Sequence, residues 1–77
     1  MNTQATDVLI HTRATLSEEQ FTEVANRIKA IHGVLRFERS RHKPNFILVA
    51  YNAGQTRAIA ILNKLTRLGF NASLVGM

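Results

Sequence analysis

Histidine side chains are the main candidates for metal chemistry in this sequence. The chain has three, His11, His32 and His42, together with Met1 and Met77 and no cysteine. Imidazole and thioether groups can bind soft metal ions, but without cysteine the thiolate, the usual ligand for such ions, is missing. The histidines fall in different parts of the expected fold and are not expected to converge. The sequence therefore predicts no bound metal or other cofactor, and a site built from histidine or methionine is the alternative.

Basic side chains gather in one stretch and give the chain a formal net charge of +5. They are Arg36, Arg39, Arg41 and Lys43, and Arg13 is expected nearby. Such a patch suits a phosphate backbone or an acidic protein surface, although a solvated hairpin is the simpler interpretation. An RNA-recognition module would also need outward aromatic residues on both central strands, and the first expected strand has none. Nucleic acid is therefore kept only as a less favoured partner.

Groups that could carry out catalysis are missing from the sequence. It contains no Ser/His/Asp arrangement, no glycine-rich phosphate loop and no pair of carboxylates in an expected cleft, and it has only five acidic residues. Ser17 is the one suggestive hydroxyl, and the start of a helix explains it better. The sequence thus predicts a protein that is not an enzyme.

Length and composition favour one small globular domain covering residues 1–77. With 77 residues, 45% of them hydrophobic, the chain can form one thin core. The first residues do not form a basic stretch followed by an apolar run, and no segment approaches the ~20 apolar residues of a membrane span. A cytoplasmic location without membrane contact is expected by default.

The first half of the chain shows a strand, a helix and a second strand. Residues 7–13 alternate in polarity, which predicts a short strand with Val8 and Ile10 on one face. Ser17 and Gln20 have the spacing of a capping box, and a helix with an apolar stripe follows and ends at Gly33. Residues 34–41 then form a polar strand that suits a sheet edge.

In the second half a strand, a helix and a last strand follow the turn at Pro44 and Asn45. Residues 46–51 are apolar at every position, which is typical of a central strand covered on both faces. Residues 56–68 form an amphipathic helix that Gly69 stops, and residues 70–75 form the last strand. The order predicts an α+β, ferredoxin-like βαββαβ sandwich, a four-stranded antiparallel sheet with two helices on one face. Right-handed crossovers place the first and third strands at its centre.

Three segments of the chain carry a family resemblance: Ile31-His32-Gly33-Val34, Val49-Ala50-Tyr51-Asn52 and Leu65-Thr66-Arg67-Leu68-Gly69-Phe70-Asn71-Ala72. In this order they resemble the heavy-metal-associated domain of copper chaperones and P-type ATPases, and the resemblance covers roughly residues 8–75. In that family a Gly-Met-Thr-Cys-x-x-Cys loop binds the metal. Counted back from Gly33, the two cysteine positions fall near Ser17 and Gln20, whose side chains are poor ligands for soft cations. The resemblance thus implies a degenerate member that has lost its metal site. Phe70 occupies the aromatic position that shields the metal loop in the ATPase domains, and because no site remains to shield, it is interpreted as a core residue.

Apolar side chains are expected on the open face of the sheet as well as in the core. If Val49 and Tyr51 point toward the helices, as the resemblance implies, Leu9, Phe46, Leu48 and Ala50 point outward. A free monomer seldom leaves such a patch bare, so either a protein partner or a second copy covers it, or the assignment of faces is inverted by one residue.

The favoured function is therefore a heavy-metal-associated-like module for protein interaction or self-association, with a metal-handling pathway as one setting. The alternatives are a metal-binding or metal-transport protein with His/Met ligands, and weak nucleic-acid binding through the basic hairpin.

Overall fold

All six expected elements are present in the computed structural model, which describes residues 5–75. Two helices alternate with four strands along the chain, in the order strand, helix, strand, strand, helix, strand. Their bounds are β1 Ala5–Thr12, α1 Glu18–Lys29, β2 Val34–Arg39, β3 Phe46–Asn52, α2 Ala58–Arg67 and β4 Ala72–Val75.

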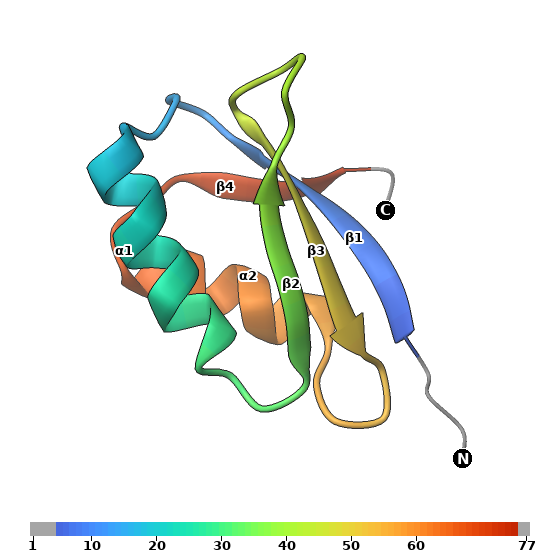
Figure 1. Cartoon of the computed structure of the whole chain (residues 1–77). Coiled ribbons are helices and arrows are strands. Elements are labelled where there is room, and N and C mark those ends of the chain that lie inside the picture. Colours follow the sequence, from blue (N-terminus) through green and yellow to red (C-terminus); the bar gives the residue numbers. More distant parts are fainter. Residues whose placement is uncertain (1–4, 76–77) are drawn as a thin grey trace.

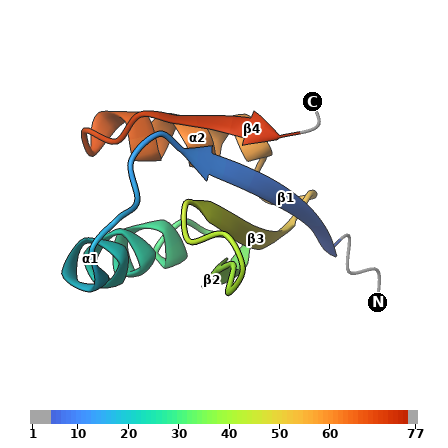
Figure 2. The ribbon, with the colours of Figure 1, turned by 90° about the horizontal axis from the view of Figure 1, so that it is seen from above.

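The four strands form one antiparallel sheet with the order β2-β3-β1-β4. Both helices cover the same face of this sheet (Figure 1), and α1 packs against β2 while α2 packs against β4. Seen from above, β1 and β3 lie between β4 and β2 (Figure 2). The predicted α+β, ferredoxin-like fold is confirmed, with the first and third strands at the centre and the polar second strand at an edge.

Alternate residues of the strands point into a core between the sheet and the helices. Val8 and Ile10 of β1 are buried there, as are Ile47 and Val49 of β3. The helices contribute the other half of this core through their apolar stripes, as Val24, Ala25 and Ile28 of α1 and Ala58, Ile61 and Leu65 of α2. The predicted assignment of strand faces is therefore correct, and the next residue along each central strand lies on the open face.

Several element ends differ from the predicted ones. β1 is not short: it begins by Ala5, because it pairs with β3 as far as Asn52. Ala5 and Thr6 are small and exposed, so they carry no hydrophobic signal. α1 ends at Lys29, and Gly33, with φ +100°, turns the chain into β2 instead of stopping the helix.

At the start of α1 the predicted capping box is confirmed. The backbone N–H of Gln20 donates to Ser17 Oγ at 3.1 Å, and the backbone N–H of Ser17 donates to Gln20 Oε1 at 2.9 Å. Arg39 of β2 adds a tertiary tie, because it donates to the Ser17 carbonyl at 3.3 Å and lies 4.5 Å from the centre of the Phe21 ring. The first turn of α1 is thus held both by its own sequence and by the edge strand.

Replacing the capping serine tests this arrangement. Ser17→Ala removes the acceptor for the Gln20 N–H and should lower the free energy of unfolding by about 1 kcal/mol. Ser17→Asp keeps an acceptor and serves as the control, so it should retain most of the stability. Chemical denaturation followed by circular dichroism measures both, and a loss of only a few tenths of a kcal/mol for Ser17→Ala would contradict the assigned cap.

The two glycines with positive φ offer a second, paired test. Gly33 and Gly69 have φ of +100° and +96°, where alanine is strained. A Cβ at Gly33 would lie 2.8 Å from the Cβ of Gln55, whereas a Cβ at Gly69 would meet nothing within 4 Å. Gly69→Ala should therefore cost about 1 kcal/mol, for the backbone alone, and Gly33→Ala should cost clearly more. Equal losses in urea melts would show that the loop at Gln55 moves aside without cost.

Candidate functional site

Rows of side chains cross the open face of the sheet, which is the face that the helices leave uncovered, and three of these rows are described beyond the Ala5–Asn52 pair at its end. The pairing of the strands defines them, and each is named by its place in Figure 1. The central row is Glu38, Leu48, Leu9 and Val75; the lower row is Arg36, Ala50 and Asp7; and the upper row, toward the β2–β3 hairpin, is Phe46, His11 and Ser73.

The apolar residues predicted for this face do lie together on it. Leu48 is 43% exposed at the middle of the sheet, and Leu9, Phe46 and Ala50 around it are half-buried. Val75 of β4 is 38% exposed and extends the patch to the second edge. These residues form one apolar surface, and the charges of Arg36, Glu38 and Asp7 beside it nearly cancel. Its use in binding stays a prediction.

The aromatic ring on this face is partly covered by its neighbours. The His11 ring contacts the Phe46 ring edge-on, with 4.9 Å between the ring centres, and Lys43 Nζ lies 5.4 Å from the centre of the Phe46 ring. His11 is half-buried in this contact. Phe46 does not offer the free flat ring on which a nucleic-acid base would stack.

Asn45 fastens the hairpin to β1, a role that the sequence analysis missed. Its carbonyl accepts the backbone N–H of Thr12 at 2.8 Å and the Thr12 hydroxyl at 3.2 Å. Its side-chain nitrogen lies 3.0 Å from His11 Nε2. The Pro-Asn turn was the one available signal, and it indicates a turn without revealing the long-range partner. These bonds fix the upper row of the open face.

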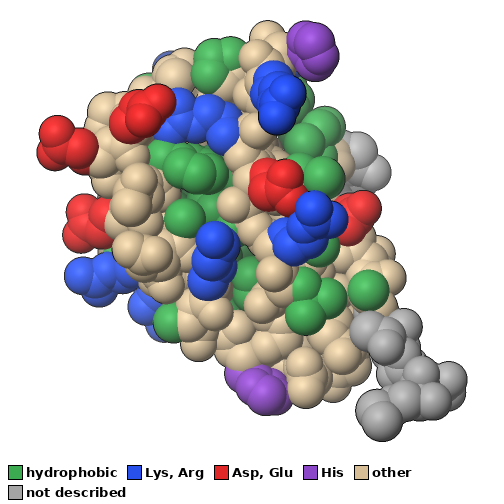
Figure 3. All heavy atoms as spheres, in the orientation of Figure 1, with side chains coloured by type: hydrophobic (Ala, Val, Ile, Leu, Met, Phe, Trp, Pro, Cys, Tyr) green, Lys and Arg blue, Asp and Glu red, His purple; other side chains and the backbone are tan. Residues whose placement is uncertain are grey.

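The three histidines lie apart. His11 is on the open face, His32 is exposed between α1 and β2, and His42 is exposed in the hairpin. Figure 3 shows histidine side chains at opposite ends of the face that it displays. Within residues 5–75 no three side chains of His, Asp or Glu come close enough to hold a metal ion. Met1 and Met77 lie outside the described residues.

The two expected cysteine positions of the metal loop are occupied by the helix cap. Ser17 Oγ and Gln20 Oε1 each accept a backbone N–H of the first turn. Beside them a hollow of about 380 Å³ lies between the β1–α1 loop and the turn after α2, lined by Thr12, Arg13, Ala14, Thr15, Leu16, Gln20, Gly69, Phe70 and Asn71. Phe70 packs against the core, as its interpretation as a core residue requires.

The basic residues do not form one surface. Arg36 lies opposite Ala50 on the open face and pairs with Glu38 at 2.9 Å. Arg39 lies opposite Ile47, on the helix side, where it contacts α1. Arg41 and Lys43 are exposed in the hairpin, and Arg13 is exposed after β1. The cluster that is continuous in sequence is thus divided between the two faces of the sheet.

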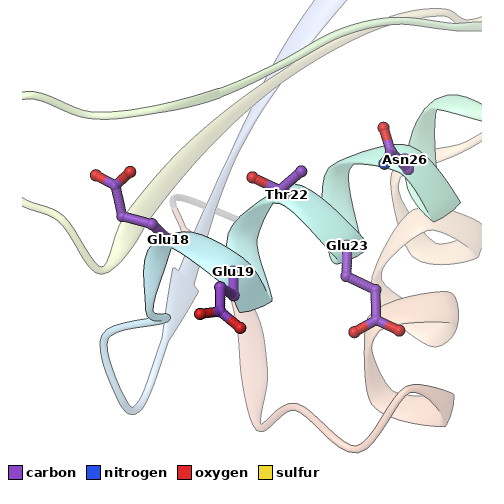
Figure 4. Close-up of a pocket in the computed structure, with 5 residues that line it drawn as sticks. All are labelled: Glu18, Glu19, Thr22, Glu23 and Asn26. Atoms are coloured by element: carbon purple, nitrogen blue, oxygen red, sulfur yellow. The ribbon is translucent and has the colours of Figure 1, made fainter.

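Another hollow, of about 470 Å³, runs along the outer side of α1 and is lined by Glu18, Glu19, Thr22, Glu23 and Asn26. Figure 4 shows that the carboxylate of Glu18 points away from those of Glu19 and Glu23. The three acids therefore do not converge on a common point. Nothing in this groove resembles a built metal or catalytic site.

Two exposed apolar side chains were not expected. Leu35 is 50% exposed at an irregularity in the β2–β3 pairing between Val34 and Arg36. Ile59 is 53% exposed on α2. For Leu35 the available signal was the pair of adjacent apolar residues at the start of β2, because a β-bulge shifts the alternation by one residue.

Among residues 5–75, neither helix is long and apolar enough to cross a membrane.

No protein-family model matches the sequence, and no curated protein matches it. Solved structures do match it closely in shape. Oxidized MerP from Ralstonia metallidurans CH34 superposes with a TM-score of 0.79 and 13% identity, covering 92% of this chain and 97% of that chain. A copper binding domain from HMA7, a P-type ATPase, also gives a TM-score of 0.79 and 13% identity, over 91% of this chain and 93% of that chain.

The CsoZ metallochaperone gives a TM-score of 0.76 and 19% identity, covering 90% of this chain and 97% of that chain. All three structures have the heavy-metal-associated fold. The predicted resemblance is therefore confirmed at the level of the fold: this chain has the fold of heavy-metal-associated domains and contains no cysteine.

Proposed function

We propose that this protein is a non-enzymatic module of the heavy-metal-associated fold that binds another protein through the open face of its sheet. One observation carries the proposal. β3 is apolar at nearly every position, yet the helices cover only one side of it, and Leu48 at its middle stays 43% exposed. Its neighbours across the sheet, Leu9 and Val75, extend the patch. An apolar surface of this kind is more stable when a partner covers it.

The start of α1 supports an interaction role over a metal-carrying role. Both atoms that could face a metal there, Ser17 Oγ and Gln20 Oε1, already accept backbone N–H groups. Binding a cation through them would uncap the helix, and neither oxygen suits a soft metal ion. The scaffold is thus complete without a metal, and its remaining distinctive surface is the open face.

A metal-handling setting has some support from the similar structures, which include a copper binding domain and a metallochaperone. In that setting the module would bind a protein that handles the metal. A site built from histidine and methionine is the alternative. Nucleic acid is less well supported, because the basic residues are divided between two faces and Phe46 is covered by His11 and Lys43. The cytoplasmic location stays a prediction.

A metal titration with an engineered counterpart tests the loss of the metal site. Competition with a chromophoric chelator should show no sub-micromolar complex of the native chain with Cu(I), Zn(II) or Hg(II), because no thiolate is present. The double variant Ser17→Cys with Gln20→Cys places two thiols at the spacing of a Cys-x-x-Cys motif. It should gain Cu(I) affinity by at least about 100-fold, or roughly 2.7 kcal/mol.

Tight stoichiometric binding by the native chain would instead favour the alternative, and His11→Ala, His32→Ala and His42→Ala would then locate the ligands. No gain in the double variant would show that the metal loop of the similar folds does not map onto Ser17 and Gln20.

Photo-crosslinking tests the docking role of the open face. A photoreactive phenylalanine analogue is placed at Leu48 or, as the control, at Ile59, which is 53% exposed on α2. In cells that make the protein, position 48 should give covalent adducts of defined mass and position 59 should not. Adducts at both positions, or at neither, would contradict the assignment of the open face as the docking surface.

A further inference from the structure

We infer that the open face binds a second copy of this chain, and that the two sheets pack face to face about a twofold axis. This inference rests on the proposed function, because it names the partner of the same surface. Three features of the described strands carry it: the balance of charge on the face, the arrangement of its rows, and its size.

The open face is nearly neutral although the chain carries +5. In its three rows Arg36 pairs with Glu38 at 2.9 Å, and Asp7 on β1 is the only other charged side chain. Two of the five acidic residues of the chain therefore lie on this face, against Arg36 and Lys43 of the ten basic residues, with Lys43 Nζ 5.4 Å from the centre of the Phe46 ring. Figure 3 shows acidic and basic side chains next to one another over the strands, with hydrophobic side chains between them.

This charge balance favours a second copy over other partners. Two chains of +5 repel each other through most of their surfaces, and the near-neutral face is where they can approach with the least repulsion. A phosphate-bearing or strongly acidic partner would gain little from this face, because its one arginine is already paired with Glu38. The chemistry of the face thus fits an apolar, near-neutral partner such as its own copy.

The arrangement of the rows is self-complementary. A twofold axis along the central row places Leu48 over Leu48 and Leu9 over Leu9 of the second copy, and it exchanges the upper and lower rows. Ala50 then lies over Phe46 of the second copy, so a small side chain meets a large one. Asp7 lies over His11 of the second copy, which brings a carboxylate toward an imidazole. The two Glu38 carboxylates also approach, but each is already paired with its own Arg36.

The size of the face sets the expected strength of the dimer. Four strands about 4.8 Å apart and about 20 Å long give a footprint of roughly 400 Å² per copy. Stable complexes bury about 800 Å² per partner. We therefore expect a weak, reversible dimer that forms in the micromolar to millimolar range of concentration, and not a permanent one.

Sedimentation equilibrium of the full chain tests the inference. Between about 10 µM and about 1 mM, the native protein should pass from monomer to dimer. Leu48→Lys and Asp7→Lys should each weaken the dimer at least tenfold. Ile59→Lys and Glu23→Lys make the same changes of charge away from the face, and they should leave the dimer unchanged. Circular dichroism checks that each variant is folded.

Crosslinking of single cysteines tests the twofold axis directly, since the chain has no cysteine of its own. Packed sheets lie about 10 Å apart, which suits a short bismaleimide crosslinker at Leu9→Cys, next to the axis. Leu9→Cys should form covalent dimers, and Ile59→Cys should not.

Each opposite result overturns the inference. A native chain that stays monomeric up to about 1 mM excludes the second copy, as does a dimer that Ile59→Lys or Glu23→Lys weakens as much as the variants on the face. If the native chain stays monomeric and position 48 crosslinks to a different protein, the inference of a second copy is wrong but the proposed function stands. A monomer with no crosslinks from position 48 overturns both.

Discussion

The pairing of β1 with β3 is the constraint on which the rest of this structure depends. It runs from Ala5 opposite Asn52 to His11 opposite Phe46 without interruption. Because successive side chains of a strand point to opposite faces, this one register sends Val8, Ile10, Ile47 and Val49 into the core. The same register places Leu9 beside Leu48 on the open face. A shift of one residue would exchange these two sets and expose the core.

The start of α1 is held by side chains of its own first turn and by the edge strand β2. Ser17 and Gln20 are exposed at one end of the sheet, whereas Leu16 beside them belongs to the core cluster. Ser17 and Gln20 meet the backbone hydrogen-bonding needs of the first turn with neutral side chains. Arg39 then ties that turn to β2. A cap and a cation–π contact thus hold this end of the fold in place.

The two faces of the sheet divide the surface chemistry of the chain. Alternation along β2 turns Arg36 toward the open face and Arg39 toward α1, so that each takes a different local partner. The open face keeps little net charge as a result, while exposed positive charge remains on the hairpin at Arg41 and Lys43. The open face thus combines apolar side chains with a small net charge, and the exposed positive charge of the hairpin lies beside it.

The sequence by itself determined the features that depend on neighbouring residues. The capping box at Ser17 and Gln20 involves residues within one turn, the stripe of α2 repeats along one helix, and the alternation of β1 assigns Val8 and Ile10 to one face. Together with the resemblance, these local patterns were enough for the order of elements, the fold and the main apolar residues of the open face. Side chains interacting within a few residues are fixed by backbone geometry alone.

Only the tertiary structure decided the features that depend on register between distant strands. The bulge that exposes Leu35 and the bonds from Asn45 to Thr12 and His11 join segments far apart in the chain. The separation of Arg36 from Arg39 also depends on the tertiary structure, because the partner of each arginine is set by what packs against its face of β2. Local periodicity says which residues share a face of a strand, but what they meet there is set by how strands and helices pack.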